Sequence, residues 1–252
     1  MRKMIIDRTL VSYTDEGVGP LVVMLHDRES APKQLRSIID LLGKTCRVVA
    51  PDLPVSGNTD TQAAVSLGQF ANEVRIVKQF IRRLGEDAHL VGHASGGGVA
   101  LRAALENCFR LQTLTLVDPV SANLLYDGDE QSHAYFHEVA DAIDPRTEAL
   151  ARGGTGIQTV SFGEHWKHDG TWDDLYPGRR HAFTNLTAAV ERNFQLLAWN
   201  ADAGAQNVRP NVPTMTLRGT EPMGLARRIA ARTAALVSGM RLPIKSGELQ
   251  HA

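Results

Sequence analysis

The sequence has few cysteines and almost no net charge. Among its 252 residues are only two cysteines. Cys46 and Cys108 sit in apolar stretches without CxxC or metal-ligand spacing, so we expect buried free thiols in a reducing compartment. The formal net charge is −1, and no basic stripe accompanies it. This balance argues against nucleic acid or an anionic membrane surface as the main partner.

Long apolar runs and cofactor loops are missing as well. No segment approaches the roughly 20 apolar residues that span a bilayer, and residues 1–7 lack the apolar core of a signal peptide. We therefore expect a soluble, cytoplasmic protein. The run from Gly96 to Gly98 is not followed by the Gly-Lys-Ser/Thr of a phosphate loop, and no HExxH pattern is present. We expect no metal and no cofactor, and a small-molecule substrate as the partner.

Short apolar runs alternate with longer helical patterns along most of the chain. The runs show no polar alternation, which predicts strands buried on both faces, and their alternation with helices predicts a mostly parallel sheet covered by helices. The expected strands are a hairpin over 4–14 and runs at 21–25, 47–50, 89–92, 111–117, 214–217 and 241–245. The expected helices cover 33–43, 67–84, 99–105 and 224–237.

Residues 120–205 break this alternation. The segment is polar, contains all three tryptophans and has turn signals at 153–154 and 169–170. We interpret it as a helical cap inserted over one end of the sheet. The chain is therefore expected to form an α/β core from residues 1–119 and 206–252, with the cap between these two parts.

Residues 90–98 place a sharp turn between an expected strand and an expected helix. A nucleophile on such a turn needs small residues two positions before and after it, because backbone segments approach closely there. Gly92 and Gly96 stand at those positions around Ala94. The following helix offers free N–H groups and a positive dipole end, which suit a developing oxyanion. The turn is complete except that alanine has no nucleophilic atom.

Ser95 is the alternative nucleophile in this stretch. It would have Gly97 two residues after it but His93 two residues before, and His93 carries a Cβ where close backbone approach is required. We therefore interpret Ser95 as the residue after the nucleophile position. Its backbone N–H is then an expected oxyanion donor, and its hydroxyl an expected helix cap. A glycine-rich turn without any chemistry is the other interpretation of the stretch.

Several segments, taken together and in order, resemble the α/β-hydrolase superfamily over nearly the whole chain. They are the turn at 90–98 and the segments 22–27, 48–54 with Gly57, 114–119, 162–166 with 170–172, and 213–219. The resemblance implies an α/β-hydrolase fold, which is a mostly parallel, doubly wound sheet with an inserted helical cap. It also implies acyl transfer by a Ser-His-Asp triad in the chain order nucleophile, acid, histidine.

The resemblance assigns Ala94 to the nucleophile position and His251 to the base. His251 is the only histidine beyond the last expected strand. Two carboxylates compete for the triad acid. Asp118 ends the strand that comes after the helix following this turn, a location that some members use for the acid. Glu221 lies near the commoner location, after the next core strand. The usual spacing there is Gly-x-x-Asp, and Glu221 comes one residue early after Gly219, so Asp118 is favoured.

The loop after the first core strand departs from the family. The family has glycine where this chain has Asp27, and the backbone of Arg28 matches the second oxyanion donor beside Ser95. A carboxylate at this rim opposes a developing negative charge unless the carboxylate is paired. The residues expected to contact substrate are His26, Asp27, His93, Trp166 and Trp172.

Ala94 admits three interpretations. In the first, which we favour, the chain is a hydrolase of an ester, a lactone or a related carbonyl compound, inactivated by a serine-to-alanine change at position 94. In the second, it is a naturally serine-less member that performs decarboxylation, lyase chemistry or C–C bond cleavage, and Asp27 favours this reading. In the third, it binds a ligand without catalysis.

Overall fold

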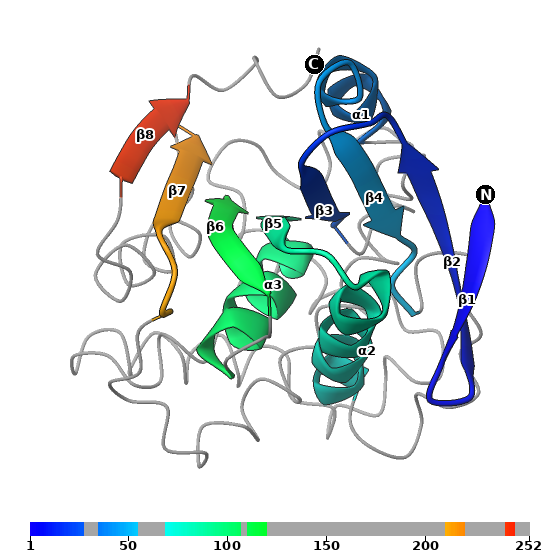
Figure 1. Ribbon diagram of the computed structural model, residues 1–252. Coiled ribbons are helices and arrows are strands. Elements are labelled where there is room, and N and C mark those ends of the chain that lie inside the picture. The colour runs from blue at the N-terminus through cyan, green and yellow to red at the C-terminus, as the bar shows by residue number, and fades with distance from the viewer. Residues whose placement is uncertain (28–34, 55–68, 107–109, 120–209, 220–239, 245–252) are drawn as a thin grey trace, which may run out of the picture.

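The computed structural model of the protein describes residues 1–27, 35–54, 69–106, 110–119, 210–219 and 240–244 (Figure 1). The three helices in this part are α1 (Arg36–Leu42), α2 (Gln69–Leu84) and α3 (Ser95–Leu105). The strands are β1 (Arg2–Ile6), β2 (Thr9–Glu16), β3 (Leu21–Leu25), β4 (Arg47–Pro51), β5 (Ala88–His93), β6 (Leu111–Val117), β7 (Thr214–Gly219) and β8 (Met240–Ile244). The predicted hairpin and the predicted strands are confirmed.

The described strands form one eight-stranded sheet in the order β1-β2-β4-β3-β5-β6-β7-β8. β2 is antiparallel to both β1 and β4, whereas β4, β3, β5, β6, β7 and β8 run parallel to one another. The chain therefore moves outward from β3 to β4 and then crosses back over β3 to β5 (Figure 1). Open α/β sheets bind ligands beyond the carboxyl ends of the strands at such a reversal.

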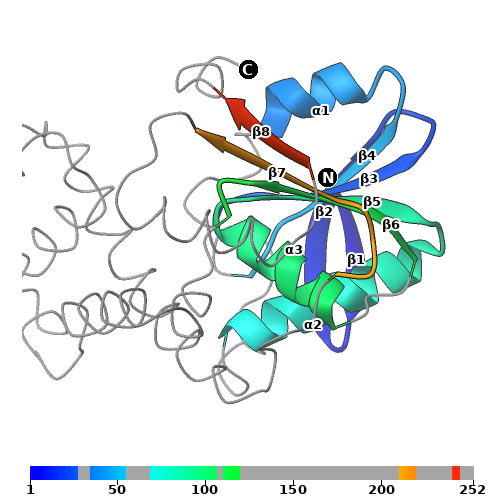
Figure 2. The ribbon, with the colours of Figure 1, turned by 90° about the vertical axis from the view of Figure 1, so that its left-hand side faces the viewer.

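Helices cover both faces of the sheet, as predicted. α1 lies on one face, and α2 and α3, which contact each other, lie on the other (Figure 2). Side chains along β3 point alternately to the two faces of the sheet, so they contribute to the hydrophobic clusters on both faces. Val23 and Leu25 belong to the cluster under α2 and α3, and Val22 and Met24 belong to the cluster under α1. This double burial explains why β3 reads as one continuous apolar run.

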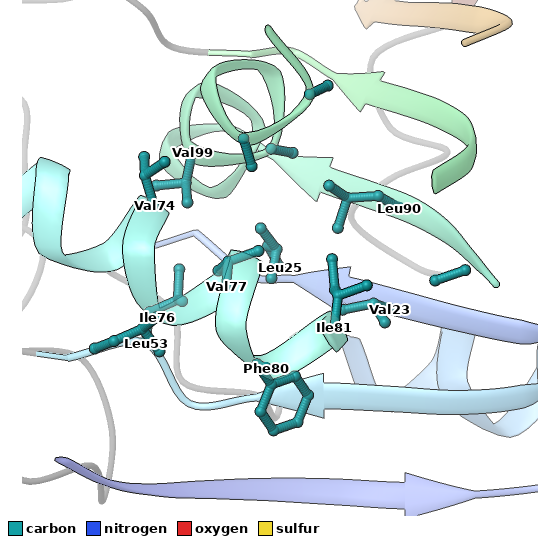
Figure 3. Close-up of a cluster of buried hydrophobic side chains, with 14 of the residues drawn as sticks. Val23, Leu25, Leu53, Val74, Ile76, Val77, Phe80, Ile81, Leu90 and Val99 are labelled. Carbon is teal, nitrogen blue, oxygen red and sulfur yellow. The ribbon is translucent and has the colours of Figure 1, made fainter. Parts of the chain in front are cut away.

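The larger core cluster lies between α2, α3 and the sheet (Figure 3). The helical spacing predicted for this part of the chain places Val77 and Phe80 of α2 on its buried face. Phe80 meets the ring of Tyr13 edge to face, with 5.1 Å between the ring centroids. Truncating a buried phenylalanine of this kind to alanine costs about 3–5 kcal/mol. The cluster therefore anchors α2 and α3 on the sheet.

Burial along β5 and β6 differs from the prediction. Leu90 and Leu114 are fully buried, whereas Val91 and Thr115 are only partly buried. The buried set faces α3, and the partly buried set faces the side on which α1 packs mainly against β4. The prediction of burial on both faces is therefore wrong for these two strands, although it holds for β3.

Helix α3 begins at Ser95 rather than at Val99, where the sequence placed its start. Three consecutive glycines weaken helix propensity and hide the first turn from sequence-based reasoning. In the structure, the carbonyl oxygen of Ala94 accepts hydrogen bonds from the N–H groups of Gly97 at 3.0 Å and Gly98 at 3.2 Å. The helix therefore starts directly at the turn, and its N-terminus belongs to the candidate site.

A buried carboxylate ties the antiparallel strands to the parallel ones. Asp15 of β2 accepts hydrogen bonds from Nε and Nη2 of Arg47, both at 2.8 Å, and one from Arg2 at 2.6 Å. The Asp15 side chain is only 4% exposed. The hydrogen bond from Arg47 lowers the pKa of Asp15 below its ordinary value, although burial acts in the opposite direction. The carboxylate thus joins residues of β1, β2 and β4.

Two predictions about the rest of the chain stay predictions. The cap over 120–205 and the helix over 224–237 lie outside the described residues, and the division into core and cap is therefore untested. Cys46 is a free thiol as expected, but it is partly rather than fully buried. None of the helices in the described ranges is long and apolar enough to cross a membrane.

Candidate active site

The candidate site lies at the carboxyl ends of neighbouring parallel strands. Asp27 follows β3, Ala94 follows β5 and Asp118 follows β6. β5 and β6 are aligned so that His93 pairs with Val117 at their ends, and β3 is paired with β5 in the same direction. The three loops therefore leave the sheet side by side, at the edge where this class of sheet binds ligands.

Two glycines let the turn close, as the sequence predicted. A Cβ on Gly92 would lie 2.5 Å from the carbonyl oxygen of Gly96, and a Cβ on Gly96 would lie 2.5 Å from the carbonyl oxygen of His26 and 2.6 Å from that of Leu25. Distances of this kind to backbone atoms leave no room for a side chain. Gly96 therefore brings the first turn of α3 against the end of β3, and with it against the loop that carries Asp27.

Ala94 stands in a strained backbone conformation between β5 and α3. Its φ is 48° and its ψ is −114°, a region that residues with a Cβ rarely adopt. Its N–H donates to the carbonyl oxygen of Val117 at 2.9 Å, which fixes the turn to the end of β6. Ser95, in contrast, is the first helical residue of α3. The strained position of the turn is thus 94, the position that the glycine spacing indicated.

The expected oxyanion donor Ser95 is engaged by Asp27. The Ser95 hydroxyl donates to Oδ1 of Asp27 at 2.8 Å, and the Ser95 backbone N–H donates to the same oxygen at 3.3 Å. Both residues are partly buried. A carboxylate at a helix N-terminus is stabilised by the dipole and by the N–H groups there. One partner of the Asp27 carboxylate is therefore the helix N-terminus that an oxyanion would use.

His26 has a structural role that the sequence did not reveal. The side chain is fully buried. Nε2 accepts a hydrogen bond from the Leu53 N–H at 3.2 Å, so Nδ1 carries the proton and donates to the Asp27 carbonyl oxygen at 2.7 Å. Both ring nitrogens thus join the loops after β3 and β4. The ring is enclosed and both its nitrogens are bonded, which gives His26 a structural role; its expected contact with substrate stays a prediction.

Asp118 and His93 lie at the same edge of the sheet as Ala94. Asp118 has a φ of 40° and donates its N–H to the Leu217 carbonyl oxygen at 2.9 Å, so its backbone is fixed between β6 and β7. The residue is partly buried and follows β6, the strand that pairs with β5. His93 ends β5 and is partly buried. Both remain candidates for their predicted roles.

The other predicted site residues lie outside the described ranges. They are Arg28, Trp166, Trp172, Glu221 and His251. Glu221 follows β7 and His251 follows β8, so both come after strands whose carboxyl ends meet at this edge. Within the described residues, no group of three or more histidine, cysteine, aspartate and glutamate side chains is placed to bind a metal ion.

The fold and the turn are those of a known family. The model of the alpha/beta hydrolase family matches residues 22–245. The chain belongs to the alpha/beta hydrolase family. The match runs from β3 to the end of β8 and includes the strand, turn and helix around Ala94. The nucleophile elbow of this fold lies on a turn of this kind. The family match and the strand order together show an α/β-hydrolase fold with a mostly parallel sheet.

Curated relatives of the chain include hydrolases of different kinds. A segment of 110 residues is 29% identical to haloalkane dehalogenase 2 of Mycobacterium tuberculosis and covers 43% of this chain and 38% of the relative. A segment of 115 residues is 32% identical to the 2-hydroxy-6-oxo-6-phenylhexa-2,4-dienoate hydrolase of Comamonas testosteroni and covers 44% and 40%. The matched part thus spans less than half of either relative.

A solved structure matches the fold over nearly the whole chain. It is a serine-to-alanine mutant of the meta-cleavage product hydrolase from Pseudomonas fluorescens, complexed with acetates. The TM-score is 0.62 at 21% identity, and the match covers 97% of this chain and 89% of that protein. At this identity the likeness shows the shared fold alone.

Proposed function

We propose that the site is built for acyl transfer from an ester, a lactone or a related carbonyl compound, and that Ala94 leaves this chain without the nucleophile. The observation that supports the proposal is the backbone of Ala94, with φ at 48° and ψ at −114°. Such a conformation costs a residue with a Cβ about 1–3 kcal/mol and persists where the surroundings enforce it. The elbow presents position 94 at the carboxyl edge of the sheet although alanine offers no reactive atom there.

The proposed steps assume a serine at position 94 and the triad and oxyanion residues that the family resemblance assigns. The serine hydroxyl attacks the carbonyl carbon while His251 takes its proton, and Asp118 orients the imidazole. The N–H groups of Ser95 and Arg28 stabilise the oxyanion, and His251 then protonates the leaving group. Water, deprotonated by His251, attacks the acyl group and releases the acid and the serine.

The Ala94→Ser variant tests this proposal. We expect a fluorophosphonate probe to label it at position 94, located by mass spectrometry of the digested protein. We expect hydrolysis of small aryl esters to rise by about 10³-fold over the unchanged chain, short of the roughly 10⁶-fold effect of a complete triad. Ala94→Gly is the matched control, because it keeps the turn and adds no nucleophile.

A second candidate function is chemistry without an acyl intermediate, such as decarboxylation, lyase chemistry or C–C bond cleavage. The contact between Ser95 and Asp27 favours it, because a carboxylate already occupies the expected oxyanion donor. The Comamonas relative is named as a hydrolase of an oxo-dienoate, so oxo acids belong in the assay. Turnover of an oxo acid by the unchanged chain, with no label on Ala94→Ser, would support this candidate. Ligand binding without turnover in either form would indicate a non-catalytic member.

A further inference from the structure

Asp27 is brought to the elbow by backbone contacts rather than by its own side chain. Gly96 lies against the carbonyl oxygens of Leu25 and His26 so closely that a Cβ there would come within 2.6 Å of both. His26 also holds the backbone of Asp27 in place, because Nδ1 of His26 donates to the backbone carbonyl oxygen of Asp27 at 2.7 Å. The residue at position 27 therefore starts beside the first turn of α3, and its side chain reaches Ser95.

One carboxylate oxygen of Asp27 accepts hydrogen bonds from both the hydroxyl and the backbone N–H of Ser95. Oδ1 accepts from the hydroxyl at 2.8 Å and from the backbone N–H at 3.3 Å. An ionised carboxylate has acceptors only, so it resembles the oxyanion that forms during acyl transfer in charge and in hydrogen-bonding partners. A substrate oxyanion would have to displace Oδ1 from this N–H and lie beside its negative charge.

We infer that Asp27 is a second determinant of reactivity: its carboxylate occupies the oxyanion site of Ser95 and disfavours any reaction or ligand that places a negative oxygen there. The inference rests on the proposed function for its catalytic consequence. Ala94 removes the nucleophile, and Asp27 independently weakens stabilisation of the transition state. Loss of one oxyanion donor lowers acyl transfer by about 10²–10³-fold in enzymes of this mechanism. Neutral ligands are expected to be tolerated at the same position.

The catalytic experiment compares three proteins: Ala94→Ser, Ala94→Ser with Asp27→Asn, and Ala94→Ser with Asp27→Gly. We expect Asp27→Gly to raise the rate of fluorophosphonate labelling and the kcat for aryl esters by about 10²–10³-fold, because the N–H of Ser95 becomes available. Asp27→Asn removes the charge and keeps the shape, and it should give a smaller increase of about tenfold. Equal rates in all three proteins would overturn the inference.

A binding experiment on the Ala94 chain does not depend on catalysis. The probes are benzoate, which presents an anionic oxygen pair, and benzamide, its neutral counterpart, each followed by the ¹⁵N–¹H signal of Ser95. We expect Asp27→Gly to bind benzoate at least about tenfold more tightly than the unchanged chain, with Asp27→Asn between them. Benzamide should bind all three proteins with the same affinity. A merely structural effect of the substitutions would change the affinity for both ligands.

The two experiments separate the inference from the proposed function. If no serine variant is labelled but benzoate binding rises as expected, acyl transfer fails as the function and the role of Asp27 stands. If Ala94→Ser is labelled and benzoate affinity is the same in every protein, the role of Asp27 fails and the proposed function stands. Should Asp27→Gly not fold, the tenfold increase expected for Asp27→Asn decides the question.

Discussion

Gly92 and Gly96 lie so close across the elbow that a Cβ on Gly92 would come within 2.5 Å of the Gly96 carbonyl oxygen. The absence of a side chain at Gly92 lets β5 approach α3, and its absence at Gly96 lets α3 approach the end of β3. This relationship fixes where position 94 is presented and how near Asp27 comes to Ser95.

The first prediction concerns Gly92. Gly92→Ala should lower the free energy of unfolding by about 3 kcal/mol, because the added methyl group meets backbone atoms that cannot move aside alone. Gly85→Ala is the control, since Gly85 has a φ of +73° and open space around it. It should lose only about 1 kcal/mol through backbone strain. Urea denaturation measures both, and equal losses would contradict the packing argument.

The second prediction concerns the strain at Ala94. Ala94→Gly should stabilise the fold by about 1 kcal/mol, because glycine adopts a positive φ without the Cβ clash. Ala94→Val should destabilise it by at least as much, since a branched side chain worsens the same clash. Thermal or urea unfolding of the two variants shows the sign of each change. A destabilised Ala94→Gly would mean that the turn is not strained.

The third prediction separates the two candidate acids. In the Ala94→Ser background, Asp118→Asn should remove most of the roughly 10³-fold gain in aryl ester turnover, because an amide presents the wrong hydrogen-bonding partner to the triad histidine. Glu221→Gln should leave turnover unchanged. The reverse result would assign the acid to Glu221.

The fourth prediction concerns His26. His26→Phe keeps an aromatic ring but leaves the Leu53 N–H and the Asp27 carbonyl oxygen without these partners, and it should destabilise the fold by about 1–3 kcal/mol. Hydrogen exchange at the Leu53 amide should become faster. His89→Phe, on the partly buried face of β5, is the control and should leave exchange at Leu53 unchanged.

The fifth prediction follows from the lowered pKa of Asp15. Because the pKa is lowered in the folded state, the pair with Arg47 contributes stability above the unfolded aspartate pKa of about 3.9, and this stability is lost as the pH falls through the folded value. Asp15→Asn should cost about 2 kcal/mol at pH 7. The difference from the unchanged chain should shrink below about pH 4. Unfolding measured between pH 7 and pH 3 shows this trend.

The control for Asp15 is an exposed carboxylate with an arginine partner. Asp40→Asn removes the ion pair with Arg36, in which both side chains are more than half exposed. Exposed surface pairs of this kind contribute little to stability. A similar pH dependence in both variants would show that burial of Asp15 does not matter.

The sequence alone determined the strands, the elbow and its glycines. Apolar runs such as 21–25 encode buried strands through local composition, and the spacing of Gly92 and Gly96 around Ala94 reflects a steric requirement within a few residues. These features are local, so one sequence reveals them.

Only the tertiary structure decided what His26, Asp27 and Ser95 do. The sequence assigned Ser95 as an oxyanion donor and His26 as a substrate contact. In the folded chain, the Asp27 carboxylate accepts hydrogen bonds from Ser95, and the His26 ring is bonded to two loops. Asp27 and Ser95 are far apart along the chain and meet because β3 and β5 are neighbours in the sheet and Gly96 lets α3 approach. Contacts of this kind depend on strand order and on distances of a few tenths of an ångström, which no local pattern encodes.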